Sequence, residues 1–252
     1  MRLLLRNETG KFTLTKELIS NDQIPPYAIL SHTWRQDNEE VTFEDIINGT
    51  GKDKLGYEKI RFCREQARQD GLLYFWIDTC CINKRNGAEL SRSINSMFRW
   101  YRNATRCYVY LSDVSSPPVD ANNECNPRPW ESDFRESRWF TRGWTLQELL
   151  APASIEFFSR ERKRLGDKSS LKQQICEITN IPHSAIQGDP LSQFSVEERL
   201  RWIEHRKTKL EKDKTYSLLG IFDVYILSIY GEGTASALGR LLDEFHKMQK
   251  CI

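Results

Sequence analysis

The sequence predicts an α/β fold in which a parallel sheet of four to five strands is flanked by helices and followed by a helical extension. Short apolar runs of strand length alternate with amphipathic segments of helical period along residues 1–160. Along residues 161–252 only helical periods recur. Because no flexible linker divides the two parts, we expect the extension to pack on the α/β core rather than to form a separate domain.

Four apolar runs bounded by polar residues predict the strands, and they lie at 27–31, 72–77, 107–112 and 155–158. The run at 72–77 is continuously apolar, as expected of a strand that is covered on both faces of a parallel sheet. Helical segments separate the runs. This order implies parallel strands joined by right-handed crossovers.

Two helices are predicted between the strands, at 54–70 and 88–103, where apolar residues recur along one stripe. A shorter helix carries Trp144 and ends before Pro152. Residues 113–138 contain four prolines, so we expect an irregular insertion there.

The helical extension shows three signals. Apolar stripes predict helices over 171–178 and 238–248, and Ser195 with Glu198 forms a capping box at the start of another. The charged run at 206–214 is expected to be a solvated loop.

Composition favours a soluble, cytoplasmic protein. Seven cysteines with no C-x-x-C spacing are expected to be buried free thiols in a reducing compartment. The 37 basic and 35 acidic residues are spread along the chain, so no basic stripe favours nucleic acid. No stretch approaches the ~20 apolar residues that a membrane span requires.

Two common kinds of site find no support. The four histidines have no metal-ligand spacing with cysteines or acidic residues, so no metal is expected. Neither G-x-x-x-x-G-K-[ST] nor G-x-G-x-x-G occurs, so neither phosphate-binding loop is indicated.

The most distinctive stretch runs from Trp139 to Leu150 and places Trp144 and Glu148 four residues apart on one helix. Side chains with this spacing emerge from the same face, one turn apart. A carboxylate held beside an indole is a candidate chemical site. The alternative is that Trp144 belongs to the core and Glu148 is a solvated helix residue.

Polar clusters also occur directly after two of the predicted strands. Ser31, His32 and Trp34 come after the first, and the segment 78–83, which includes two cysteines, comes after the second. In open parallel sheets, ligands bind outside the carboxyl ends of the strands. A thiol nucleophile formed by Cys80 or Cys81 with His32 is one alternative, but buried packing is the more usual role of such cysteines.

These stretches resemble successive blocks of the fungal heterokaryon incompatibility (HET) domain. The blocks cover residues 28–34, 74–83 and 142–150, together with Glu89, Met97 and Tyr101. Later segments, at 213–222 and 230–233, resemble the region after this domain in proteins where it is attached to NLR-like receptors. The likeness covers nearly the whole chain.

HET domains are similar to TIR domains in the predicted order of strands and helices, so the resemblance implies a TIR-like, flavodoxin-like core. Many TIR domains cleave NAD⁺ between nicotinamide and ribose with the glutamate of a W-x-x-x-E helix. The match here is Trp144 to Glu148, which implies that Glu148 is catalytic. A fixed carboxylate suits this reaction, because it stabilises the positive charge that develops on the ribose.

Other residues of these blocks are then expected to bind the substrate. Trp34 or Trp144 would stack on a ring of NAD⁺, and Arg142 would meet a phosphate or hold Glu148. Asp78, Asn83 and Glu89 would hydrogen-bond ribose. The full set of expected substrate-binding residues is Ser31, His32, Trp34, Asp78, Cys81, Asn83, Glu89, Arg142 and Trp144.

The sequence therefore predicts a cell-death effector domain of fungal non-self recognition that consumes NAD⁺, requires no cofactor, and is activated by self-association. An NLR-like nucleotide-binding region or a partner protein would control it. Two alternatives stay open. One is a non-catalytic signalling module in which Glu148 forms a buried ion pair with Arg142, and the other is a fold that senses a nucleotide without turnover.

Overall fold

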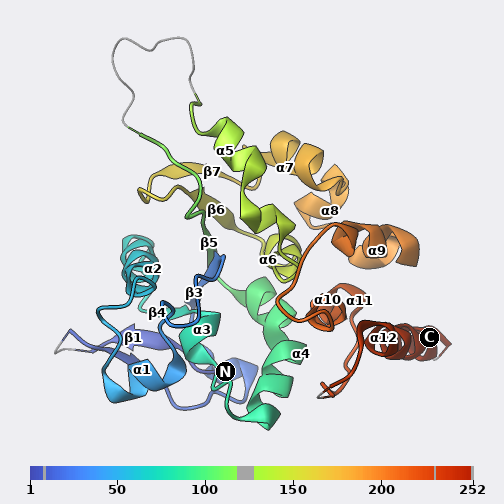
Figure 1. The fold of residues 1–252 in the computed structure, drawn as a ribbon, viewed down its shortest axis with the longest axis horizontal. Coiled ribbons are helices and arrows are strands. Elements are labelled where there is room, and N and C mark those ends of the chain that lie inside the picture. Colours follow the sequence, from blue (N-terminus) through green and yellow to red (C-terminus); the bar gives the residue numbers. More distant parts are fainter. Residues whose placement is uncertain (8–9, 118–127, 230, 251–252) are drawn as a thin grey trace.

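The computed structural model describes residues 1–7, 10–117, 128–229 and 231–250 of the chain. The strands of this part form one mixed sheet of seven, in the order β2-β1-β4-β3-β5-β6-β7 (Figure 1). Their bounds are Leu4–Arg6 for β1, Phe12–Leu14 for β2, Tyr27–His32 for β3, Tyr74–Trp76 for β4, Arg106–Tyr110 for β5, Ile155–Phe158 for β6 and Arg164–Asp167 for β7.

The four predicted strands are present and form the centre of the sheet. Strand β3 pairs in parallel with β4 on one side and with β5 on the other, and β5 pairs in parallel with β6. Across the sheet they stand in the order second, first, third and fourth along the chain. The expected α/β core with parallel strands is confirmed for these four.

The expectation of a wholly parallel sheet of four to five strands is wrong at both edges. Strand β1 pairs antiparallel with β2 and β4, and β7 pairs antiparallel with β6. The β1–β2 and β6–β7 pairs need only short connections, without a crossover helix. Strands β1 and β2 hold three residues each and β7 holds four, too few for a clear apolar period. Since β7 lies beyond residue 160, the sheet continues into the part expected to be helical.

Helices surround this sheet. In the first part of the chain they are α1 (Phe43–Asn48), α2 (Tyr57–Gln69), α3 (Asp78–Cys81), α4 (Gly87–Asn103), α5 (Glu131–Glu136) and α6 (Thr145–Leu150). Later come α7 (Lys172–Thr179), α8 (His183–Gln187), α9 (Val196–Glu204), α10 (Asp213–Tyr216), α11 (Leu219–Phe222) and α12 (Thr234–Lys250).

The helices expected between the strands are found as α2, α4 and α6. The expected irregular insertion at 113–138 contains one helix, α5, while its residues 118–127 lie outside the described part. Helix α5 is short and buries Phe134 against Phe157 of β6, with ring centroids 5.4 Å apart. A helix of this length, in proline-rich surroundings, leaves no clear helical period in the sequence.

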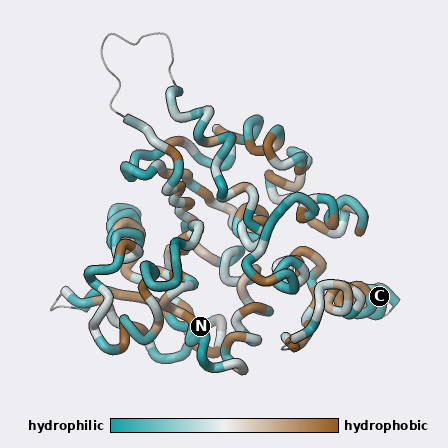
Figure 2. The backbone as a smooth tube through the Cα atoms, in the orientation of Figure 1, coloured by the Kyte–Doolittle hydropathy of each residue, from teal (hydrophilic) through white to brown (hydrophobic). Residues whose placement is uncertain are grey.

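Aromatic side chains form the core on both faces of the sheet. On one face Phe62 of α2 packs on Tyr110 and Phe158, with centroid distances of 5.1 Å to each ring. On the other face Trp76 of β4 packs on Trp100 and Tyr101 of α4, at 5.5 and 5.9 Å. Figure 2 shows the apolar residues gathered along the central strands and on the inward sides of the helices. The sheet is therefore covered on both faces, as its continuous apolar strands require.

Of the later helices, α11 lies against α4 and α8 lies against α6 (Figure 1). In α11, a Cβ added to Gly220 would lie 2.0 Å from Cβ of Phe98, so α11 and α4 are in close contact. The side-chain amide of Asn95 in α4 forms two hydrogen bonds, of 3.0 and 3.1 Å, with the backbone of Ile226, which follows α11. The division into residues 1–160 and 161–252 stays a prediction, but the two stretches share one sheet and one set of helix contacts.

Most of the charged run at 206–214 is the exposed or partly exposed loop that was expected, but its first residue is buried. Arg206 is only 6% exposed, and Lys207 pairs with Arg142 in a short bridge beside α6. Helix α10 begins at Asp213. Charge alone is misleading here, because a buried arginine can satisfy backbone carbonyls that no sequence pattern reveals.

In the described part of the chain, no helix combines the length and apolar character needed to cross a membrane.

Gly220→Ala is expected to destabilise the fold by about 1–3 kcal/mol, because the added methyl group has no space beside Phe98. Gly239→Ala is the matched control, since nothing lies within 4 Å of a Cβ at that position in α12. The control should be neutral or stabilising by up to about 1 kcal/mol. Urea unfolding of both variants measures this, and equal effects would contradict the close packing of α11 on α4.

Candidate active site

Glu148 lies in helix α6, whose six residues are all buried. Its carboxylate meets the end of β3, where the hydroxyl of Ser31 donates a hydrogen bond to Oε2 of Glu148. The Ser31 oxygen in turn accepts a hydrogen bond of 2.7 Å from the indole Nε1 of Trp139. A buried chain of hydrogen bonds thus runs from Trp139 through Ser31 to Glu148, and we call these three residues the Glu148 group.

The environment of Glu148 disfavours its charged form. Burial, and the nearby charge of Asp78, raise the pKa of the Glu148 carboxyl from 4.5 to about 8. The hydrogen bond from Ser31, the charge of Arg142 and the Tyr101 hydroxyl act in the opposite direction, but they do not outweigh burial. The carboxyl is therefore mostly protonated at neutral pH. Strongly shifted carboxyls of this kind cluster at functional sites.

A second polar group surrounds Asp78, at the start of α3 just beyond strand β4. Its Oδ2 accepts a hydrogen bond of 2.8 Å from the indole Nε1 of Trp34. Nζ of Lys84 lies 3.7 Å from the centre of the Trp34 ring, so one face of that ring is already covered by a cation. Burial raises the pKa of the Asp78 carboxyl as well. Because Asp78 acts on the pKa of Glu148, the two groups are neighbours.

His32 belongs to this second group. Its Nε2 lies 3.9 Å from Oδ1 of Asp78, too far for a hydrogen bond, and has no other partner among the described residues. Burial and the nearby cations, Lys59 first among them, hold the pKa of the imidazole well below its usual range, so it is neutral. Successive residues of a strand point to opposite faces, and Ser31 and His32 accordingly serve different groups.

Glu89 is held away from these groups by its own contacts. Its Oε1 accepts hydrogen bonds from Arg2 and from the backbone N–H of Asn83, the latter at 3.0 Å. The side-chain oxygen of Asn83 accepts from the backbone of Arg85 at 3.1 Å. The expected roles of Glu89 and Asn83 in binding ribose stay predictions, and in this conformation both residues fix the start of helix α4.

The two cysteines after strand β4 are packing residues in this structure. Sγ of Cys81 accepts a hydrogen bond of 3.4 Å from the backbone N–H of Ile77, and both thiols are buried. Burial raises the pKa of the Cys80 thiol well above its usual range. A thiolate nucleophile at Cys80 is therefore disfavoured at neutral pH.

Arg142 and Trp144 flank the start of α6. Glu148 bonds to Ser31, whereas Arg142 acts on it only through its charge. The carbonyl of Arg142 accepts hydrogen bonds from Arg206 at 3.0 Å and from the Thr145 hydroxyl at 2.8 Å. Trp144 is partly buried and precedes α6, where its carbonyl receives the Glu148 N–H at 3.5 Å. The one-turn spacing of Trp144 and Glu148 is thus present.

Three residues near Glu148 were not among the expected site residues. They are Trp139, Tyr101 and Arg206. Trp139 lies in the distinctive stretch from Trp139 to Leu150, just before helix α6, and this position could have indicated that it lies near Glu148. Tyr101 donates to the carbonyl of Leu30 at 3.1 Å, and only the tertiary structure brings it close.

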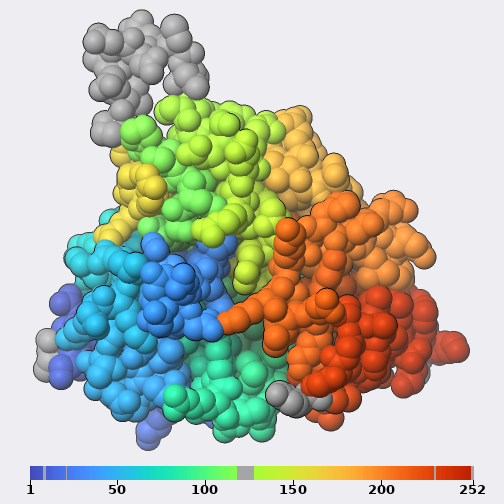
Figure 3. Space-filling view, in the orientation of Figure 1, coloured from blue at the N-terminus to red at the C-terminus, as the bar shows by residue number. Residues whose placement is uncertain are grey.

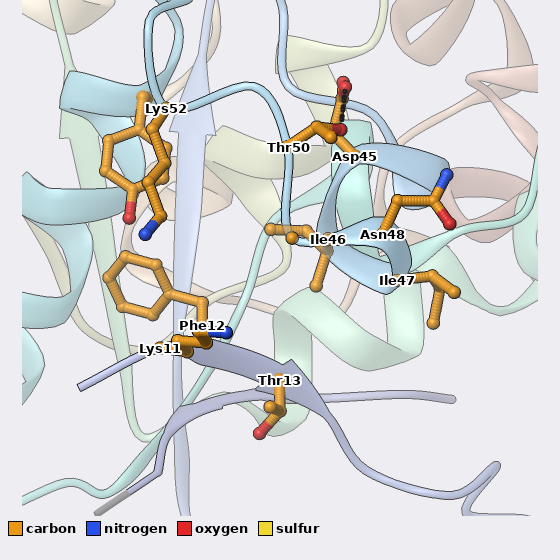
Figure 4. A pocket seen from close by; sticks show the side chains of 11 residues that line it. Lys11, Phe12, Thr13, Asp45, Ile46, Ile47, Asn48, Thr50 and Lys52 are labelled. Atoms are coloured by element: carbon orange, nitrogen blue, oxygen red, sulfur yellow. Dashed lines mark hydrogen bonds between the residues drawn. The ribbon is translucent and has the colours of Figure 1, made fainter. Parts of the chain in front are cut away.

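The Glu148 group is closed in this conformation, since Glu148 is 6% exposed. A cavity of about 670 Å³ lies elsewhere, between α4, α8, α11 and α12, with Phe98 and Phe245 in its walls. A smaller one of about 190 Å³ lies between β2 and α1. Figure 4 shows Phe12 and Ile46 on its two sides. Ligand sites usually exceed about 300 Å³, so the smaller cavity is a poor candidate. A substrate reaches Glu148 only after some part of the fold moves.

Within the described residues, no group of three His, Cys, Asp or Glu side chains is placed to hold a metal ion. The two buried carboxyl groups, Glu148 and Asp78, lie near the neutral imidazole of His32 and near several cationic side chains.

The comparisons with known proteins agree with the resemblance of the motifs. Residues 27–123 match the family described as heterokaryon incompatibility protein (HET). Over its whole length the chain is 54% identical to the vegetative incompatibility protein HET-E-1 of Podospora anserina, and it spans 18% of the length of that protein. No solved structure matches the chain.

Glu148→Gln is expected to change the pH dependence of stability. In the wild type the folded carboxyl has a pKa of about 8, against 4.5 in the absence of the fold. Between these values the folded state holds more protons than the unfolded state, so stability falls as the pH rises, by up to about 1.4 kcal/mol per pH unit. Glutamine has no proton to lose, so the variant should gain stability relative to the wild type from pH 5 to pH 8.

Urea unfolding at several pH values measures this difference. Glu244→Gln serves as the control, because Glu244 is a partly exposed residue of helix α12. The control should follow the wild type at every pH. Parallel curves for the wild type and Glu148→Gln would show that Glu148 titrates normally.

Proposed function

We propose that this chain, whose residues 27–123 match the heterokaryon incompatibility (HET) family, is a cell-death effector that cleaves NAD⁺ between nicotinamide and ribose. Glu148 is the catalytic residue of this proposal. The observation that carries it is a buried carboxyl, one turn after Trp144, whose pKa lies near 8. Such a group suits a reaction in which positive charge develops on the substrate.

The raised pKa is compatible with this role. The nicotinamide ring of NAD⁺ is a cation, and an opposite charge nearby favours the ionised carboxylate. Ionising a carboxyl of pKa about 8 at pH 7 costs about 1.4 kcal/mol. The substrate's charge readily offsets so small a cost. As the ribose becomes more cationic in the transition state, the attraction to the Glu148 carboxylate grows, and this difference lowers the barrier.

Self-association is the proposed trigger. With 6% exposure, Glu148 is shielded in the isolated chain, so a step that opens the site must precede catalysis. Contacts between copies of the chain would supply that step.

The proposal also includes a TIR-like, flavodoxin-like core. The order of the four parallel strands, second, first, third and fourth, supports it, because flavodoxin-like sheets begin with the same order.

The wider setting is likewise a proposal. HET-E-1 is much longer than this chain, which spans 18% of it. We infer that an NLR-like nucleotide-binding region or a partner protein brings copies together in the cytoplasm after non-self recognition. The reaction needs NAD⁺ and water and no further cofactor.

The test measures nicotinamide release from NAD⁺ by chromatography, using wild type that is artificially clustered by a multivalent tag. Glu148→Gln should lower the rate at least 100-fold while the protein stays folded, because the ribosyl cation loses its stabilising charge. Glu244→Gln is the matched control and should leave the rate unchanged. No release from clustered, folded wild type would instead favour the non-catalytic signalling module.

A further inference from the structure

Arg206 lies two residues beyond helix α9, in the segment that crosses to α10. It is 6% exposed. Its Nε donates to the carbonyl of Trp202 at 3.1 Å, and its Nη1 donates to the carbonyl of Arg142 at 3.0 Å and to the hydroxyl of Thr145 at 2.9 Å. Three acceptors therefore fix the plane of the guanidinium.

The third nitrogen of this guanidinium, Nη2, is buried and has no hydrogen-bond partner among the described residues. The acceptors on the other two nitrogens are neutral oxygens, so no carboxylate offsets the charge through these bonds. A buried cationic donor without a partner is costly, and each such group requires an explanation. A bound anion is the simplest one.

The position of Arg206 connects it to the Glu148 group. The segment carrying it is fastened to the turn before α6, since Lys207 N–H donates to the Thr141 carbonyl at 2.6 Å and Gly143 N–H donates to the Lys207 carbonyl at 2.9 Å. The contact is tight, because a Cβ added to Gly143 would lie 2.5 Å from Cγ2 of Thr208. Burial lowers the pKa of Arg206 to about 10 and the charge of Glu148 acts in the opposite direction, so the two side chains are close enough to interact.

The same segment ends in a contact that is easily broken. Nζ of Lys209 lies 2.5 Å from Oδ2 of Asp37, and both side chains are more than half exposed. Exposed ion pairs of this kind are weak because water and salt screen them. Figure 3 shows this segment reaching across to the residues just beyond strand β3, where the surface is hollowed. Its release would open a path toward Arg206.

We propose that Nη2 of Arg206 binds a phosphate oxygen of the nucleotide whose ribose faces Glu148. The inference rests on the proposed function and names the residue that anchors the anionic part of the substrate. The planar guanidinium is suited to phosphate, which it meets through charge-assisted hydrogen bonds. Arg142, beside it in the structure, adds positive charge to the same region.

Binding of inorganic pyrophosphate to the artificially clustered protein, in which the site is proposed to open, tests this inference without any turnover, and calorimetry measures the affinity. Arg206→Gln should weaken the affinity about 10- to 100-fold, the range expected for the loss of a charged hydrogen bond. The matched control is Arg199→Gln, which removes another buried arginine from helix α9, one bonded to the carbonyl of Ile221. That control should bind pyrophosphate as the wild type does.

Arg206→Lys keeps the charge and serves as the second variant if Arg206→Gln does not fold. It should retain more affinity than glutamine and less than arginine. Clustered, folded wild type that binds no pyrophosphate at millimolar concentration, or equal losses in Arg206→Gln and Arg199→Gln, would overturn the inference.

Turnover separates this inference from the proposed function. Pyrophosphate binding that depends on Arg206, without NAD⁺ cleavage, would support the anion site and contradict the proposed reaction. Glutamate-dependent cleavage with an unchanged KM for NAD⁺ in Arg206→Gln would do the reverse.

Discussion

The hydrogen bond between Ser31 and Glu148 is the contact on which the candidate site depends. It joins the end of the central strand β3 to helix α6 across 117 residues of sequence, inside the core. The same serine oxygen accepts from Trp139, so the turn before α6 is fixed to the sheet as well. Without Ser31, the indole N–H of Trp139 would lose its partner and Glu148 would lose one of its hydrogen bonds, and buried groups without partners are costly. The carboxyl is thus held in place by a network that also holds the fold.

Burial causes both the raised pKa of Glu148 and the closure of the site around it. A carboxyl removed from water favours its protonated form, and this gives Glu148 its pKa of about 8. The shielding that shifts the pKa also keeps substrate out. In the proposed function, this closure would keep the effector inactive until the chains assemble, because NAD⁺ cannot reach a shielded Glu148. Exposure of Glu148 to water would both admit a ligand and lower the pKa of its carboxyl.

The sequence predicted the central strands, helices α2, α4 and α6, and the one-turn spacing of Trp144 and Glu148, since all of these depend on local period. It failed where tertiary contacts decide. Ser31 and His32 lie in two neighbouring groups, because successive residues of a strand point to opposite faces, and their expected roles in one substrate site stay a prediction. Arg206 looked like part of a solvated charged run, because only folding shows that backbone carbonyls surround it. The edge strands β1, β2 and β7 are too short to show a period.

Glu148 is a buried carboxyl whose raised pKa keeps it mostly protonated near neutral pH. Carbon-13 NMR of protein labelled at the glutamate carboxyl carbon measures this directly, with the Glu148 signal identified by its loss in Glu148→Gln. The Glu148 carboxyl is expected to titrate near pH 8, well above the 4.5 of an ordinary glutamate. A Glu148 signal that titrates near pH 4.5 would contradict it.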